Sequence, residues 1–479
     1  MRTSARCTFS EAKAQQTLKT LEQARRGRLE LSSGRATTVA LLTASPIQRQ
    51  QRPGQIFAMP DSLQIALKND SDSSNLHAYI SGLAIQNGNQ RCFVKADESQ
   101  YFPQNPSAIG SPLAEEVAIP LGNPGNIVNI KIPQIAGGRI YISEGRLTFL
   151  LNPGPALVEP SVLNPSDPNY KVDFSFCEFT LNNDQLYANI SYVDFTGRIP
   201  ISLSLQQQSG QSQYVAGMPP NGLDALADRL RDQARKDSQP WDKLIFQHDG
   251  KNLRILNATH GNAVGASFDG YYEPHIEQVW QKYKSGATMK INTQASPGIL
   301  EGRVNAKDEL MIGDEAFSKP NTADILGSNS GPFTTGSSAT RNAIIPRLAA
   351  AFLRSTLLVT ENHPSLPDTF YRSDPTNHYA RLVHEVNLDK KGYAFAYDDV
   401  QADGSEDQSG KVNAGDPVLF TIGVGGKGAV SGDSVAPPAQ QPQQQPQSRD
   451  YQRDTPPLPS QAELKKEGWG GKLKGLFKK

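Results

Sequence analysis

The sequence predicts a β-rich α+β fold, in which an antiparallel sandwich or barrel is joined to a mixed α/β region. Between residues 55 and 205, short apolar runs are separated by glycine, asparagine and proline, a pattern typical of many short antiparallel strands. Between residues 206 and 364, apolar residues at helical spacing alternate with strand-like segments. The chain contains 34 prolines, 40 glycines and only 5 methionines, which favours a turn-rich, strand-containing body over a helical bundle.

The first predicted region, 55–205, is a succession of segments of strand length. Residues 62–67 alternate apolar and polar side chains, and a polar turn at 69–72 follows them. Residues 78–85 form a second apolar run that ends before an Asn-Gly-Asn turn. Further strands are expected at 126–132, 139–150, 171–181, 186–195 and 199–206.

The second predicted region, 206–364, mixes helices with strands. Residues 221–236 predict an amphipathic helix, because Leu223, Leu226 and Leu230 recur at helical spacing. Two more helices are expected at 274–283 and 341–357. Strands are expected at 243–247, at 253–256 and within 287–313.

A return segment follows at residues 365–425. It contains strand-like runs at 382–386 and 418–422. We therefore expect this segment to rejoin an earlier region and to complete the functional unit.

The two ends of the chain are polar. Residues 1–54 predict an N-terminal extension with one thin helix at 10–30. Residues 426–479 predict a disordered glutamine/proline linker followed by a lysine-rich tail. A weakly amphipathic pattern in the tail would suit contact with a membrane or a partner, but interrupting glycines favour a solvated tail.

Composition excludes several classes of protein. Lysine plus arginine equals aspartate plus glutamate, at 48 each, so no overall positive field favours nucleic-acid binding. No run of about 18 apolar residues predicts a membrane-spanning helix. The sequence contains no metal-binding or phosphate-binding motif with the required spacing, so neither a metal nor a cofactor is expected. A disulfide between Cys92 and Cys177 is compatible with the sequence but cannot be deduced from it.

Two acidic residues within apolar, aromatic sequence segments are the candidate catalytic groups. Glu178 and Asp194 lie in two consecutive predicted strands joined by a short turn at 182–185. Burial penalises a charged carboxylate, so acids in such positions need a specific reason. A carboxylate pair beside a groove can hydrolyse a glycosidic bond, with one acid protonating the leaving oxygen and the other activating water. The alternative is a pair of structural acids held by backbone amides or by a neighbouring arginine such as Arg198.

Longer motifs resemble a known family. Residues 158–161, 176–180 and 188–195 are similar to the signature of glycoside hydrolase family 64, and supporting stretches occur in order between residues 55 and 425. This resemblance implies a thaumatin-like architecture, with a β-barrel or sandwich domain beside an α/β domain and a wide groove between them. It also implies endo-type, inverting hydrolysis of β-1,3-glucan with release of short laminari-oligosaccharides.

The resemblance assigns roles to individual residues. Glu178 matches the general acid and Asp194 the general base, with the two carboxyl groups expected roughly 6.5–9.5 Å apart. Thr180, Asn182 and Tyr187 match positions that line the sugar groove. Tyr187 is alternatively a core aromatic. Glu159 is a candidate third carboxylate of the groove or, equally, a structural acid before a proline turn.

Partner and location follow from the same resemblance. We expect a monomer that binds β-1,3-glucan, and an extracellular or cell-wall location. The first 35 residues contain no recognisable secretory signal, so the sequence also leaves an intracellular location open. The alternative function is a non-catalytic, thaumatin-like protein that binds β-1,3-glucan in the cell wall.

Overall fold

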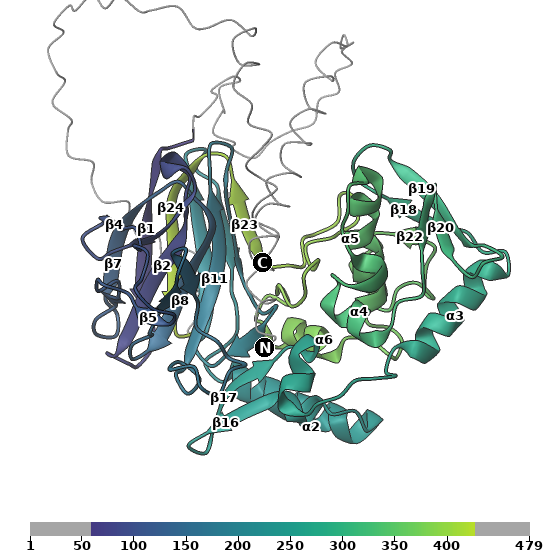
Figure 1. Ribbon diagram of the computed structural model, residues 1–479, viewed down its shortest axis with the longest axis horizontal. Helices are drawn as coiled ribbons and strands as arrows, with labels where there is room; N and C mark the ends of the chain where they lie inside the picture. The colour runs from purple at the N-terminus through teal and green to yellow at the C-terminus, as the bar shows by residue number, and fades with distance from the viewer. Residues whose placement is uncertain (1–58, 427–479) are drawn as a thin grey trace, which may run out of the picture. The chain divides into compact units, whose positions relative to one another are not determined.

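The computed structural model describes residues 59–426 (Figure 1). The helix predicted at 10–30, the glutamine/proline linker and the lysine-rich tail lie outside these residues. Within them, no helix combines the length and the apolar character that crossing a bilayer requires.

A five-stranded sheet brings the two ends of the described chain together. Its strands, in spatial order, are β15 (Ser212–Val215), β14 (Ile201–Gln207), β24 (Pro417–Val424), β1 (Ser62–Asn69) and β7 (Ile127–Pro133). Strand β24 runs parallel to β1 and antiparallel to β14. The strand predicted at 418–422 is confirmed, and the return segment completes a sheet that the first strand begins.

A larger antiparallel sheet carries most of the candidate site residues. Its strands, in order, are β23 (Lys411–Ala414), β12 (Leu186–Ile190), β11 (Phe174–Leu181), β8 (Ile135–Glu144), β2 (Leu76–Ala84), β3 (Gln90–Val94) and β4 (Gln100–Tyr101), and β6 (Ile119–Pro120) pairs with β2. Strands β11 and β12 form the predicted hairpin, and the Gln185 carbonyl accepts a 3.0 Å hydrogen bond from the Asn182 amide at its turn.

The two sheets bury one face each in a shared apolar core. Ile65 of β1 and Phe420 of β24 belong to the same buried cluster as Cys177 and Phe179 of β11. Side chains alternate along a strand, so Glu178 points to the opposite face of the larger sheet, which we call the outer face. The shared core agrees with the predicted sandwich, whereas the strand pairings of residues 59–426 give open sheets and no closed barrel.

Aromatic side chains cover part of the outer face. The Phe149 ring lies 5.3 Å from Tyr79, 5.1 Å from Phe93 and 5.5 Å from Tyr141, measured between ring centroids. Phe149 immediately precedes a small sheet of β10 (Ala156–Val158), β9 (Leu150–Asn152) and β5 (Ser111–Pro112). Strand β11 therefore lies between two apolar layers, and its polar side chains begin where the aromatic cluster ends.

The remaining elements form the α/β part of the chain. The helices are α2 (Gly222–Asp237), α3 (Glu273–Lys284), α4 (Thr322–Gly327), α5 (Ala339–Leu353) and α6 (His378–Val386). One sheet contains β13 (Phe195–Gly197), β17 (Lys251–Leu256) and β16 (Ile245–His248). Another contains β21 (Glu315–Phe317), β20 (Leu310–Ile312), β19 (Ile299–Val304), β18 (Met289–Asn292) and β22 (Asn362–His363). Short 3-10 helices are η1 (Ile85–Asn87), η2 (Trp241–Leu244), η3 (Ala258–Val264), η4 (Gly331–Phe333) and η5 (Pro367–Thr369).

The three helices predicted in this part are confirmed, but the strand predicted at 382–386 is wrong. These residues form the second half of α6, whose first turn is capped by the Asn377 side chain. Tyr379, Leu382 and Val386 are buried on one helical face. This helical spacing can be recognised only when the segment is taken from the cap at Asn377 rather than from residue 382.

The disulfide considered between Cys92 and Cys177 is absent. Both thiols are free and buried, in β3 and β11 respectively. Strands β2 and β8 lie between these two strands, which keeps the sulfurs beyond bonding distance. Burial raises the pKa of the Cys92 thiol to about 11 and that of Cys177 to about 12, so both are unreactive at neutral pH.

A buried histidine makes the α/β part sensitive to acid. His275 on α3 is 1% exposed, neither ring nitrogen has a hydrogen-bond partner, and burial lowers its pKa to about 4. The unfolded chain binds this proton at about pH 6.5, so His275 costs stability as pH falls from about 6.5 to about 4.

We expect His275→Leu to reduce the acid sensitivity of folding. The variant removes a contribution of up to about 1.4 kcal/mol per pH unit within that window. Urea unfolding at pH 7 and pH 5 measures this, with His248→Leu at a more exposed position as the control. An unchanged loss of stability between the two pH values in His275→Leu would contradict the prediction.

Candidate active site

The β11–β12 hairpin positions four of the candidate residues. Thr180 lies opposite Tyr187 in the register of the two strands, and Glu178 lies opposite Asn189. Asn182 is buried at the turn, where its Oδ1 accepts hydrogen bonds of 2.9 Å from the amides of Asp184 and Gln185. The Asn182 side chain therefore stabilises the hairpin, and its predicted sugar contact remains a prediction.

A row of polar side chains crosses the outer face beside the aromatic cluster. Its members are adjacent in register on five successive strands: Ser81, Arg139, Glu178, Asn189 and Lys411. We call this set the polar row. Glu178 is at its centre, and 22% of its side chain is exposed.

Arg139 connects two of the candidate acids. Its Nη1 lies 2.5 Å from Glu159 Oε2, and its Nη2 lies 3.4 Å from Glu178 Oε1. The guanidinium carbon lies 4.9 Å from the centre of the Phe176 ring. Burial alone would lower the pKa of Arg139, but the nearby acids, led by Glu159, outweigh burial and raise it well above its usual value.

The sequence did not identify Arg139 as the partner of Glu178. The arginine that it suggested as a partner of the two acids, Arg198, pairs elsewhere. Arg198 pairs with Asp224 at 3.2 Å rather than with Glu178. The sequence did contain one indication of the importance of Arg139. This arginine is a single charged residue at the start of the apolar segment 139–142, where a strand would place it on the same face as residue 141. Its pairing with Glu159 depends on strands that are distant in sequence, so local patterns could not show it.

Asp194 lies in a bend between β12 and β13, not within one continuous strand as predicted. Its Oδ1 lies 3.3 Å from Nε2 of His260, and its backbone carbonyl accepts a 3.0 Å hydrogen bond from the Asn257 amide. The Asn257 side chain caps η3, which carries His260. A single capped turn thus positions both the backbone and the carboxylate of Asp194.

Aromatic packing connects the bend at Asp194 to strand β11. The Phe195 ring packs 5.8 Å from that of Phe176, which lies two residues before Glu178 on the same face. Charges on both Glu178 and Asp194 act on Arg139. Arg139 therefore contacts Glu159 and Glu178 directly, and Asp194 acts on the same guanidinium only as a weaker charge.

Tyr187 and Thr180 extend this face along the hairpin. Burial, followed by the charges of Asp399, Asp407 and Glu178, raises the pKa of Tyr187, so its hydroxyl stays protonated at neutral pH. The Thr180 hydroxyl accepts a 3.3 Å hydrogen bond from the Gly137 amide, where the pairing of β11 and β8 is irregular. An irregularity of this kind turns side chains away from regular strand directions and is common beside active sites.

The segment 393–400 forms another side of this region. Asp399 Oδ1 accepts a 2.9 Å hydrogen bond from the Tyr393 hydroxyl. Next to it, the fully buried Asp398 carboxylate pairs with Arg354 at 3.0 Å and with His384 at 2.9 Å. Burial alone would raise the pKa of Asp398, but His384 and Arg354 outweigh burial and lower it. This buried cluster anchors the segment that carries Asp399.

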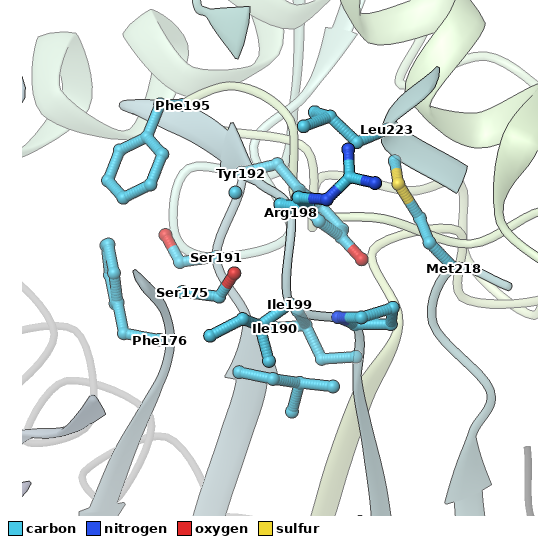
Figure 2. A pocket seen from close by; sticks show the side chains of 13 residues that line it. Ser175, Phe176, Ile190, Ser191, Tyr192, Phe195, Arg198, Ile199, Met218 and Leu223 are labelled. Carbon is cyan, nitrogen blue, oxygen red and sulfur yellow. The ribbon is translucent and has the colours of Figure 1, made fainter. Parts of the chain in front are cut away.

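A small cavity is lined by residues of β11 and by residues on both sides of the bend that holds Asp194. Figure 2 shows Ser175, Phe176, Ser191 and Phe195 lining it. Its volume is about 10 Å³, which is room for one water molecule, and the buried Ser175 hydroxyl has no hydrogen-bond partner. The cavity is too small for a sugar.

The chemistry of the site rests on carboxylates and hydroxyls. Among residues 59–426, no cluster of three or more histidine, cysteine, aspartate or glutamate side chains is arranged to hold a metal ion. Two partly exposed acids near one arginine are suited to proton transfer to and from a bound molecule.

Comparison with known proteins gives this arrangement its family. Residues 61–424 match the family 64 profile of glycoside hydrolases, described as beta-1,3-glucanase. The chain belongs to glycoside hydrolase family 64. Within it, a glucan endo-1,3-beta-glucosidase of Arthrobacter sp. (strain YCWD3) is 30% identical over 358 residues, which cover 72% of this chain and 62% of that protein.

Solved structures of family 64 share the fold. A crystal structure of a laminaripentaose-producing beta-1,3-glucanase in complex with laminaritetraose has a TM-score of 0.67 and 28% identity, and covers 76% of this chain and 99% of that one. A beta-1,3-glucanase domain from Clostridium beijerinckii has a TM-score of 0.58 and 21% identity, with 76% and 98% covered. The predicted resemblance to family 64 is thereby confirmed.

The Arg354–Asp398–His384 cluster should be essential for stability. In Asp398→Asn, the side chain loses its charge and places an amide donor where Oδ2 now accepts from the Ala394 amide at 2.9 Å. We expect a loss of about 3–5 kcal/mol in the free energy of unfolding, because the Arg354 charge stays buried. Chemical denaturation measures the loss.

A surface pair provides the control for this prediction. Glu385 pairs with Arg229 at 2.9 Å and with Arg381 at 2.6 Å while 41% of its side chain is exposed, so Glu385→Gln should cost less than about 1 kcal/mol. Equal losses in the two variants would contradict the special role of the buried cluster.

Proposed function

We propose that this chain is an endo-acting glycoside hydrolase that cleaves β-1,3-glucan into short laminari-oligosaccharides. Membership of family 64 supports this activity, as do the names of its relatives, a glucan endo-1,3-beta-glucosidase and a laminaripentaose-producing beta-1,3-glucanase. The observation that carries the proposal is the Glu178 carboxylate on the outer face, 3.4 Å from Arg139, with the charge of Asp194 also acting on that guanidinium.

Glu178 acts as the general acid and Asp194 as the general base of an inverting reaction. Glu178 protonates the glycosidic oxygen as the bond to the anomeric carbon breaks. Asp194 removes a proton from a water molecule that attacks this carbon from the opposite side. Its partner His260 and the amide of Asn257 hold Asp194 in one orientation, which favours a fixed position for that water.

The side chains around the two acids suit a polysaccharide. The Thr180 and Tyr187 hydroxyls lie on the same face as Glu178 and offer hydrogen bonds to sugar hydroxyls. The Tyr187 ring also offers an apolar surface to a pyranose. The Lys411 Nζ lies 6.0 Å from the centre of this ring. The wide groove implied by the family would carry the rest of the chain of glucose units.

Glucan binding without turnover is the alternative function. The two acids favour catalysis over this alternative, because a protein that only binds glucan has no need of a proton donor and acceptor near each other. The two functions differ in one measurement, which is the release of new reducing ends from a linear β-1,3-glucan.

We expect Glu178→Gln and Asp194→Asn each to lower kcat by about 10²–10⁴-fold, because each removes one proton-transfer group from the transition state. The measurement is reducing-sugar release from linear β-1,3-glucan, with product analysis by NMR. The first product of the wild type should have the α configuration at its new reducing end, as inversion requires.

Controls separate loss of chemistry from loss of folding. Glu144→Gln, at the exposed end of β8 in the same sheet, should keep the wild-type rate. Both active-site variants should keep the wild-type melting temperature and still bind glucan. Wild-type protein that binds glucan but releases no reducing sugar would establish the binding function instead.

A further inference from the structure

Glu178 lies between two neighbours that favour opposite protonation states. On β8, the Arg139 guanidinium lies 3.4 Å from Glu178 and favours the ionised carboxylate. On β12, the directly opposite residue is Asn189, which is 4% exposed and has a buried Oδ1 without a hydrogen-bond partner. An amide oxygen accepts hydrogen bonds only, so a carboxyl group must be protonated to bond to it. A side chain that engages the charge of Arg139 weakens the first of these two effects.

Glu159 is the acid closest to Arg139 among its ion pairs within residues 59–426. It lies just after β10 and binds Arg139 at 2.5 Å, whereas Glu178 is 3.4 Å from the same guanidinium. Both acids are mostly shielded from solvent, with side-chain exposures of 24% and 22%, so water screens these charges only in part. Glu159 contributes more than Glu178 to the field that raises the pKa of Arg139.

We propose that Glu159 is a positioning residue that engages the charge of Arg139, so that Glu178 can keep the proton it delivers to the glycosidic oxygen. This role rests on the proposed function of Glu178 as the general acid. It also differs from both sequence-based interpretations of Glu159, a groove carboxylate and a structural acid before a proline turn, because the Glu159 carboxylate is engaged by Arg139.

Other titratable groups around Glu178 do not replace Glu159. Burial raises the pKa of each nearby phenol, which therefore stays neutral at neutral pH; these are Tyr141, Tyr187 and Tyr393. Lys411, at the far end of the polar row, pairs with Asp407 at 3.4 Å. Asp194 acts on Arg139 more weakly than Glu159 or Glu178 does.

The test is the pH dependence of kcat in Glu159→Gln, measured on linear β-1,3-glucan. The variant keeps the shape of the side chain but frees the charge of Arg139 to act on Glu178. The basic limb of the kcat profile should move to lower pH by about one unit, and kcat on that limb should fall about tenfold. KM should stay within about twofold of the wild-type value, because no sugar contact is lost.

Three companion variants make the result decisive. Glu159→Asp keeps the charge and should restore the wild-type basic limb, even if its shorter side chain lowers the melting temperature. Glu385→Gln also removes a carboxylate paired with arginine, at a surface far along the sequence, and should leave the profile unchanged. Glu178→Gln, measured in parallel, reports on the acid itself.

The outcomes separate this role from the proposed function. A raised KM with an unchanged pH profile in Glu159→Gln would show a sugar-binding residue and overturn the positioning role. A wild-type profile and KM in Glu159→Gln, together with an inactive Glu178→Gln, would overturn the role of Glu159 alone. Full activity in Glu178→Gln would overturn the assignment of the acid and the role of Glu159 with it.

Discussion

The structure of the site depends on the alternation of side chains along β11. Odd-numbered positions from Cys177 to Leu181 are buried in the core between the two sheets, and even-numbered positions point to the outer face. A slip of one residue would bury Glu178 among isoleucines and expose Phe179. The size of the apolar core on one side, reinforced by aromatic packing on the other, therefore fixes where the acid points.

This constraint also explains how an arginine can be largely buried there. Arg139 is on the neighbouring strand at the same level as Glu178, so the register that orients the acid orients the cation as well. Two ionised carboxylates and one guanidinium carry a net charge of −1 on this partly desolvated surface. The pairing of β8 with β11 that packs the core thus also places Arg139 beside Glu178.

The β11–β12 hairpin could be predicted from the sequence, whereas helix α6 and the ion pairs of the site could not, for physical reasons. The alternation around Glu178 and the polar turn after it are local patterns, and the structure confirms the hairpin. The helix at α6 was mistaken for a strand because residues 382–386 alone are a short apolar run, and the cap at Asn377 decides the matter. The pairing of Arg139 with Glu159 and of Asp194 with His260 joins residues 20 and 66 positions apart, which no local window contains.

The place of β24 in the five-stranded sheet has a consequence for biosynthesis. Strands β14 and β1 are separated by β24, which is the last strand of the described chain. Until the ribosome has released residue 424, two apolar strands that begin more than a hundred residues apart have exposed hydrogen-bonding edges facing each other across a gap. The nascent protein must therefore remain soluble with its sandwich unfinished, and the sheet closes only after synthesis of nearly the whole family 64 unit. Completion of the five-stranded sheet is in this sense a late event in synthesis, set by topology rather than by local stability.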